Sequence, residues 1–123
     1  MSMEKPSIVI AMREDNEDTT ELTQLLYGIE EEEIPFSFKT MAFDNPVERA
    51  YQGALFSRLS VGIAFDDKSV IVHYKNLPKS EPLFKVEKDN SVNLRILGAN
   101  AARLVKGVPF KRLYKVVNWL KTL

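Results

Sequence analysis

The stretch VGIAFDDKSVIVHY, residues 61–74, decides the fold that the sequence predicts. Two runs rich in β-branched residues, 61–65 and 69–74, flank three polar residues. Apolar runs joined by a short polar turn predict a β-hairpin, so these two strands should pair antiparallel.

The segments before the hairpin alternate between strand and helix patterns. Residues 7–12 form an apolar run typical of a buried strand, and residues 36–41 alternate as a second strand does. Apolar residues at helical spacing predict a helix over 18–32, opened by a capping box, and another over 45–58, capped by Asn45. Successive strand–helix units imply parallel strands with right-handed crossovers.

The segments after the hairpin complete the architecture. Residues 83–86 predict a short edge strand, and residues 90–105 predict a long helix with Gly107 as its stop. A last segment, 111–123, is amphipathic. We therefore expect a single domain over 1–123. Its fold class is α/β, a three-layer α/β/α sandwich with a mixed, mostly parallel sheet containing one antiparallel strand.

Composition narrows the class of protein. The chain has 123 residues, 45% of them hydrophobic and none of them cysteine. Its apolar runs fall far short of the roughly 20 residues that a membrane span needs. The N-terminal residues have no long apolar stretch, so no secretory signal is expected. We expect a cytoplasmic protein with no membrane association.

The charges are distributed unevenly along the chain. Residues 1–50 hold 12 acidic and 4 basic residues, whereas residues 51–123 hold 5 acidic and 13 basic residues. Either the two halves neutralise each other within one fold, or they form a bipolar surface that orients a partner. Nucleic acid is not an expected partner, because the basic residues are scattered and lack interleaved aromatic residues.

Motifs for catalysis are absent from the sequence. The single histidine, His73, lies in a predicted strand and is expected to have a structural or surface role. No glycine-rich phosphate loop and no GxSxG motif occurs. We therefore expect a chain that is not an enzyme.

Four consecutive glutamates, Glu30 to Glu33, follow the first predicted helix. Carboxylates are mildly unfavourable at the C-terminal end of a helix, where the dipole is negative. They could form a solvated acidic turn, or one or two of them could ligate a hard cation such as Mg²⁺ together with ligands from elsewhere.

The stretch LGANAARLVKG, residues 97–107, places small residues along one helix. Small residues let a neighbouring element approach closely. The stretch could pack tightly inside the domain. Alternatively, it could be a flat docking surface with Asn100, Arg103 and Lys106 at its polar edge.

Four stretches carry a resemblance to a known family: LLYGIEEEEIPF (25–36), SRLSVGIAFDDKSVIVHYKNLP (57–78), PLFKV (82–86) and LGANAARLVKGVPF (97–110). Together they resemble the small subunit of the diol/glycerol dehydratase-reactivating factor. The resemblance runs over roughly residues 7–110. It implies an α/β/α sandwich with a mixed sheet, in agreement with the pattern above.

The resemblance also implies a function. The family's small subunit is a non-catalytic, chaperone-like part of an ATP-dependent factor that releases damaged cobalamin from adenosylcobalamin-dependent diol or glycerol dehydratase by subunit exchange. Its partners are a large subunit, an Hsp70-like ATPase, and transiently the dehydratase. The cytoplasmic location could then include association with a microcompartment. The isolated chain could also form a homodimer. The alternatives are a cobalamin-interface component of a dehydratase, like its medium subunit, and a stand-alone binding domain of the same fold.

The resemblance assigns site residues as well. Matched position by position, it makes Glu31 the ligand of Mg²⁺ or a similar ion shared with the large subunit, and it implies no cofactor in the isolated chain. Relatives often have glycine where this chain has Glu33, so the helix exit is expected to differ slightly. The expected partner interface comprises Gly28, Glu30, Glu32, Asn100, Arg103 and Lys106.

Overall fold

A computed structural model describes residues 5–15 and 17–113 of the chain. The predicted segment 111–123 therefore lies, beyond Leu113, outside the described residues. The elements in chain order are β1 (Ile8–Met12), the 3-10 turn η1 (Thr20–Leu22), α1 (Thr23–Glu31), β2 (Phe36–Thr40), α2 (Pro46–Phe56), β3 (Val61–Phe65), β4 (Ser69–Tyr74), β5 (Phe84–Glu87) and α3 (Ser91–Lys106).

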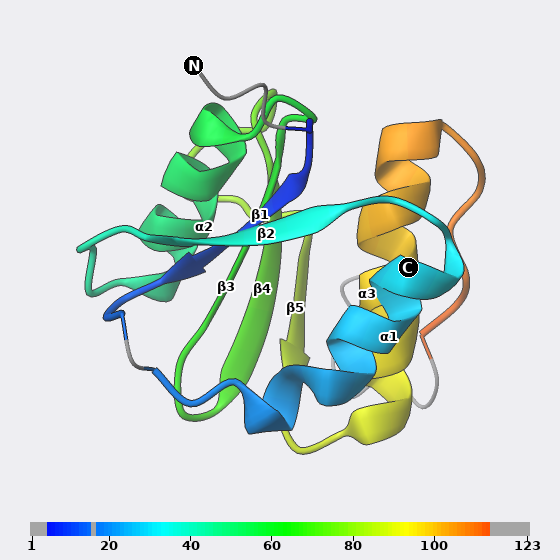
Figure 1. Cartoon of the computed structure of the whole chain (residues 1–123), viewed down its shortest axis with the longest axis horizontal. Helices are drawn as coiled ribbons and strands as arrows, with labels where there is room; N and C mark the ends of the chain where they lie inside the picture. Colours follow the sequence, from blue (N-terminus) through cyan, green and yellow to red (C-terminus); the bar gives the residue numbers. More distant parts are fainter. Residues whose placement is uncertain (1–4, 16, 114–123) are drawn as a thin grey trace.

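The five strands form one mixed sheet in the order β2-β1-β3-β4-β5 (Figure 1). Strand β1 pairs in parallel with β2 and β3, and β4 pairs antiparallel with β3 and β5. Strand β4 is therefore the one described strand that runs against the other four. The hairpin predicted at 61–74 is confirmed, with Phe65 opposite Val70 at the turn.

The helices cover both faces of the sheet, which gives the predicted three layers (Figure 1). Helix α2 packs on β1, β3 and β4, whereas α1 and α3 pack on each other over the opposite face. The connections explain this arrangement. From β1 the chain crosses through α1 to β2, and from β2 it returns through α2 to β3 in the opposite direction across the sheet. Right-handed crossovers in opposite directions place their helices on opposite faces.

Local capping sets three of the helix ends. The Asn45 side chain accepts hydrogen bonds from two backbone N–H groups at the start of α2, and the Asn90 side chain accepts one at the start of α3. Gly107 closes α3 with a φ of 71°. The helix predicted from Asp18 begins later, because the Asp18 carboxylate accepts from Thr20 N–H and initiates the 3-10 turn instead.

The main core lies between the sheet and the α1–α3 pair. It contains Ile8, Ile10, Met12, Leu22, Leu25, Ile29, Val61, Ile63, Phe65, Val70, Val72, Val86, Leu94, Leu97, Ala101 and Ala102. The smaller core beneath α2 contains Ala50, Ala64 and Ile71. Helix α2 exposes Leu55 and buries Arg49. The reason is that Arg49 hydrogen-bonds backbone carbonyls at the strand ends, which helical periodicity does not reveal.

Helices α1 and α3 touch through their backbones at two glycines. A Cβ atom on Gly98 would lie 2.0 Å from the Leu25 carbonyl oxygen, and a Cβ atom on Gly28 would lie 2.1 Å from the Arg95 carbonyl oxygen. No side chain fits at either position unless a helix moves. The small residues of 97–107 thus serve tight internal packing, the first of the two alternatives.

Replacing Gly98 by alanine tests this contact. We expect Gly98→Ala to lower the free energy of unfolding by about 1–3 kcal/mol, because the added methyl group forces α1 away from α3. The matched control is Gly53→Ala in α2, where the added Cβ atom meets its neighbours at 3.4 Å or more. That change should be neutral or stabilising, because alanine favours helix. Equal denaturation midpoints for the two variants would contradict the prediction.

None of the helices in the described part of the chain is long and apolar enough to cross a membrane.

Candidate functional site

The four consecutive glutamates occupy four different environments at the end of α1. Glu31 is the last residue of the helix and Glu32 caps it. Glu33 adopts a φ of 62°, the left-handed conformation that glycine tolerates best. This explains why a glycine suits that position, and it costs the chain about 1 kcal/mol of backbone strain. The structure thus separates residues that the sequence shows only as a run.

Glu31 forms a two-pronged ion pair with Arg95 of α3. Arg95 Nε donates to Glu31 Oε1 at 3.1 Å, and Arg95 Nη2 donates to Glu31 Oε2 at 2.5 Å. These hydrogen bonds hold the pKa of the Glu31 carboxyl below its ordinary value and raise the pKa of the Arg95 guanidinium. The Glu31 side chain is 47% exposed, so the pair faces solvent. Its carboxylate is ionised and accessible.

Glu32 is held more firmly, by two cations of α3. Lys106 Nζ donates to its Oε1 at 2.6 Å, and Arg103 Nε donates to its Oε2 at 3.0 Å. The hydrogen bond from Lys106 and then that from Arg103 lower the pKa of the Glu32 carboxyl. The Glu32 side chain is only 11% exposed. Glu32 therefore joins α1 to α3, whereas Glu30 and Glu33 are exposed.

The residues predicted at the partner interface divide into two groups. Gly28 and Asn100 lie inside the chain: Asn100 is fully buried and hydrogen-bonds the Lys111 backbone through both its side-chain oxygen and nitrogen. Arg103 and Lys106 reach the surface but are occupied by Glu32. Their contact with a partner stays a prediction.

Arg95 was missed by the sequence interpretation. A signal was available, because Arg95, Arg103 and Lys106 recur at helical spacing along α3. What the spacing could not show is which glutamate each of them meets.

The ion pairs also explain the uneven distribution of charge along the chain. The long-range ion pairs of Glu21, Glu31, Glu32 and Glu48 each join an acid of residues 1–50 to a base of residues 51–123. This supports mutual neutralisation within one fold.

Glu31 is the residue whose ability to bind a divalent cation has to be considered. Mg²⁺ prefers oxygen ligands, and an exposed ionised carboxylate can supply one. Among the described residues, no group of three or more histidine, cysteine, aspartate or glutamate side chains could hold a metal ion. The exposed Glu31 carboxylate could supply one ligand to such an ion, and that role stays a prediction.

His73 has the structural role that was predicted. It is fully buried, and its Nδ1 accepts from Tyr74 N–H at 2.9 Å. The hydrogen must then lie on Nε2, which donates to the Lys79 carbonyl oxygen at 2.9 Å. His73 thus ties β4 to the following loop.

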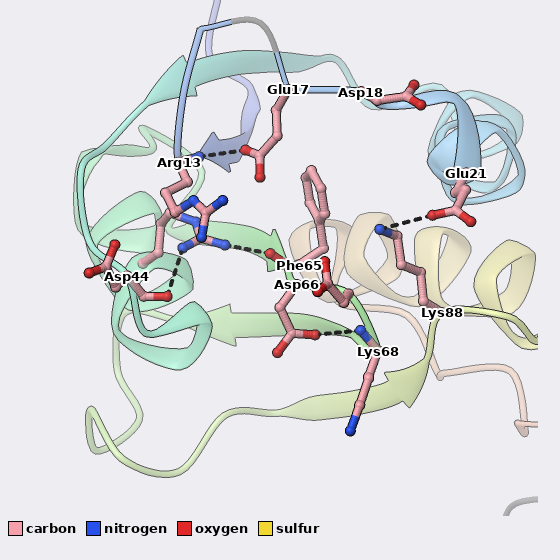
Figure 2. Close-up of a pocket in the computed structure, with 11 residues that line it drawn as sticks. Arg13, Glu17, Asp18, Glu21, Asp44, Phe65, Asp66, Lys68 and Lys88 are labelled. Atoms are coloured by element: carbon pink, nitrogen blue, oxygen red, sulfur yellow. Dashed lines mark hydrogen bonds and ion pairs between the residues drawn. The ribbon is translucent and has the colours of Figure 1, made fainter.

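A pocket of about 570 Å³ opens at the carboxyl ends of β1 and β3 (Figure 2). At this edge of the sheet the crossover connections through α1 and α2 run in opposite directions. Ligands commonly bind at such a point in α/β folds. Two of the pocket's acidic side chains serve the local structure: Glu17 accepts from Arg13 N–H, and Asp66 accepts from Lys68 N–H. Arg49, which also lines it, donates to backbone carbonyls, including that of Phe65. These three charged side chains thus stabilise turns and strand ends.

Comparisons with known proteins agree with this architecture. The family model described as dehydratase medium subunit matches residues 5–111. The propanediol dehydratase-reactivating factor small subunit of Salmonella typhimurium is 46% identical over 110 residues, which cover 89% of this chain and 93% of that protein. The diol dehydratase-reactivating factor small subunit of Klebsiella michiganensis is 50% identical over 91 residues, 73% of each chain.

Two solved structures are also similar. A chain in the structure of diol dehydratase-reactivating factor complexed with ADP and Mg²⁺ superposes with a TM-score of 0.80 at 45% identity, covering 89% of this chain and all of that one. A chain of a glycerol dehydratase reactivase superposes with a TM-score of 0.78 at 26% identity, covering 88% and 98%.

The chain therefore belongs to the dehydratase medium-subunit family. Within that family it groups with the small subunits of diol and propanediol dehydratase-reactivating factors, which confirms the resemblance seen in the sequence.

The Glu32 ion pairs predict a pH dependence of stability. The pKa of Glu32 is lower in the folded chain than its ordinary value of 4.5, so its contribution is complete at neutral pH. It is lost as the pH falls below 4.5 through the folded-state pKa. We expect Glu32→Gln to lower the free energy of unfolding by about 1 kcal/mol at pH 7, and the difference to be smaller at pH 3, where the Glu32 carboxyl is protonated to a larger extent.

Thermal denaturation at both pH values checks this. Glu30→Gln removes the same charge from an exposed neighbour and should have little effect at either pH. A Glu32→Gln deficit that persists unchanged at acid pH would contradict the assignment.

Proposed function

We propose that this chain is the non-catalytic, chaperone-like small subunit of an ATP-dependent reactivating factor. The factor would release damaged cobalamin from an adenosylcobalamin-dependent diol or glycerol dehydratase. The observation that carries the proposal is the match, at 45% identity and a TM-score of 0.80, to a whole chain of diol dehydratase-reactivating factor. In this proposal, ATP hydrolysis belongs to the large subunit, an Hsp70-like partner, and the chain works in the cytoplasm, in part in association with a microcompartment.

Subunit exchange is the proposed mechanism. The family model that matches this chain describes a dehydratase subunit, so the same fold occurs on both sides of the exchange. A chain with this fold can leave the large subunit and be replaced there by the medium subunit of the dehydratase. The strain or clash that follows would open the dehydratase and release the cobalamin.

Glu31 is proposed as this chain's ligand for a divalent cation at the contact with the large subunit. Its carboxylate is ionised, half-exposed and placed at a helix C-terminus, where the dipole favours a cation. The bound ion would supply electrostatic attraction between the chains rather than catalysis. The rest of the interface would surround it, including Glu30 and the polar edge of α3.

Two other functions make different predictions. A cobalamin-interface component of a dehydratase would bind cobalamin, whereas a stand-alone domain would not bind an ATPase subunit. The match to 93% of a reactivating-factor small subunit favours the proposed function over both. Binding of cobalamin by this chain alone would favour the first alternative.

Replacing Glu31 tests the assembly. We expect Glu31→Gln to weaken the Mg²⁺-dependent binding of the large subunit at least about tenfold, which corresponds to ~1.4 kcal/mol, because one anionic ligand is lost. Titration calorimetry with and without Mg²⁺ measures this. The control is Glu33→Gln, which removes an exposed charge of the same run that is not among the predicted interface residues. Equal affinities for wild type and Glu31→Gln in Mg²⁺ would reject Glu31 as the ligand.

We further propose that the isolated chain forms a homodimer through the free edge of β2. Strand β2 pairs only with β1 among the described strands. Pro35 and Met41 form backbone hydrogen bonds with β1, which set the register of the pair. In this register the backbones of Ser37 and Lys39 also hydrogen-bond to β1, whereas the N–H and C=O groups of Phe38 point away from β1. The Phe38 side chain is 46% exposed.

Antiparallel pairing about a two-fold axis at Phe38 is self-complementary. It places Phe38 opposite its own copy and Lys39 opposite Ser37, so no like charges face each other. Aromatic pairs across strands are favourable.

Sedimentation of the isolated chain tests the homodimer. We expect a reversible dimer in the wild type and a monomer in Phe38→Pro, because proline removes only the N–H that points away from β1. Phe38→Ala is the control: it retains that N–H and should weaken the dimer without abolishing it. A wild-type chain that remains monomeric at high concentration would contradict the proposal.

A further inference from the structure

We infer that Arg95 holds Glu31 in the free subunit and that a divalent cation must displace it when the large subunit binds. The inference rests on the proposed role of Glu31 and concerns the regulation of that same site. It makes Arg95 a positioning residue, because it would act through Glu31 and not through contact with the ion.

The geometry shows why the guanidinium and the cation exclude each other. Arg95 donates to both carboxylate oxygens of Glu31, at 3.1 and 2.5 Å. A cation that binds either oxygen would lie within a few ångströms of the guanidinium charge, with the carboxylate between them as the single shared anion. Like charges at such distances repel strongly when water is excluded, as it is at a protein interface. The repulsion therefore favours ligation in which Arg95 releases the carboxylate, although each oxygen keeps a second lone pair.

Release of Glu31 is feasible because Arg95 has other partners on α1. Its Nη1 donates to Gln24 Oε1 at 2.9 Å, and its guanidinium carbon lies 5.5 Å from the centroid of the Tyr27 ring. Both contacts can persist after Glu31 turns toward a cation. The ion pair itself is half-exposed, with side-chain exposures of 40% and 47%, and exposed pairs are weak. Arg95 can thus move aside without leaving the helix surface.

Glu32 shows the opposite arrangement and explains why Glu31 is the releasable carboxylate. Two cations, Arg103 and Lys106, bond the two oxygens of Glu32, and that side chain is nearly buried. Removing Glu32 from these partners would leave both cations without their carboxylate at the α1–α3 contact. The two adjacent glutamates thus have different roles. Glu32 keeps its ion pairs with α3, whereas Glu31 exchanges Arg95 for a divalent cation.

The consequence is a competition that sets the cation concentration needed for assembly. In the free subunit, Arg95 neutralises Glu31 and keeps it from weak cation binding. In the complex, the partner's ligands and the divalent ion together outcompete Arg95. Weakening the ion pair between Arg95 and Glu31 should therefore lower the Mg²⁺ concentration at which the complex forms.

The experiment measures the Mg²⁺ concentration for half-maximal assembly of this chain with the large subunit. We expect Arg95→Gln to lower that midpoint about three- to tenfold, because glutamine can still bond Gln24 but carries no charge. Lys111→Gln is the matched control, because Lys111 acts on Glu31 only through space. It should shift the midpoint much less. In a Glu31→Gln background, Arg95→Gln should have no effect, since contacting residues that act through one another are not additive.

The outcomes separate this inference from the proposed function. If Glu31→Gln abolishes the Mg²⁺ dependence but Arg95→Gln leaves the midpoint unchanged or raises it, the role of Arg95 is overturned and the proposed role of Glu31 stands. If Glu31→Gln leaves the Mg²⁺ dependence intact, both are overturned. Equal shifts for Arg95→Gln and Lys111→Gln would reduce the effect to general electrostatics and also overturn the inference.

A second measurement needs only the isolated chain. Carboxyl NMR titration should give Glu31 a pKa below its ordinary value in the wild type and a higher value in Arg95→Gln. The same pKa in both chains would show that the ion pair does not form in solution, which would overturn the inference without any assembly assay.

Discussion

The backbone contact between α1 and α3 at Gly28 and Gly98 is the constraint on which the candidate site depends. Cβ atoms at these positions would lie about 2 Å from carbonyl oxygens of the facing helix, so only glycine permits the approach. Because the helices lie this close, Arg95 reaches Glu31, and the last turn of α3 reaches Glu32. A wider spacing would separate these charges, and the end of α1 would become an unpaired acidic cluster at an unfavourable dipole.

This arrangement resolves the apparent excess of anions after the first helix. Glu32 is satisfied internally, Glu31 is paired but accessible, and Glu30 is exposed. Glu33 occupies a left-handed position better suited to glycine. The acidic run is therefore not one binding site. It consists of one carboxylate that joins two helices, one that pairs with Arg95 at the surface, and two exposed to solvent.

The family relation gives these local features a context. In the proposed subunit exchange, a chain of this fold would be held in turn by two different partners. Such a subunit needs contacts that are specific but reversible. A solvated ion pair at a helix end and a short free edge strand both meet that requirement, because each can exchange partners without disturbing the core between the sheet and the α1–α3 pair.

The sequence by itself determined the order of elements, the hairpin, the mixed sheet and the caps at Asn45 and Gly107. These follow from short-range patterns: alternation in strands, helical spacing of apolar residues, and side chains that bond their own backbone. The family resemblance also assigned a metal-ligand role to Glu31, which stays a prediction. The start of α1 was misplaced because Asp18 can cap a 3-10 turn as well as an α-helix.

Only the tertiary structure decided which charges meet. Arg49 is buried because it hydrogen-bonds carbonyls at the ends of two strands, and Asn100 is buried because the segment after α3 returns over it. The Arg95–Glu31 pair joins residues 64 positions apart in the chain. No local pattern specifies such partners, because they depend on how closely α1 and α3 pack, and that distance is set by Gly28 and Gly98, each of which lies against the backbone of the opposite helix.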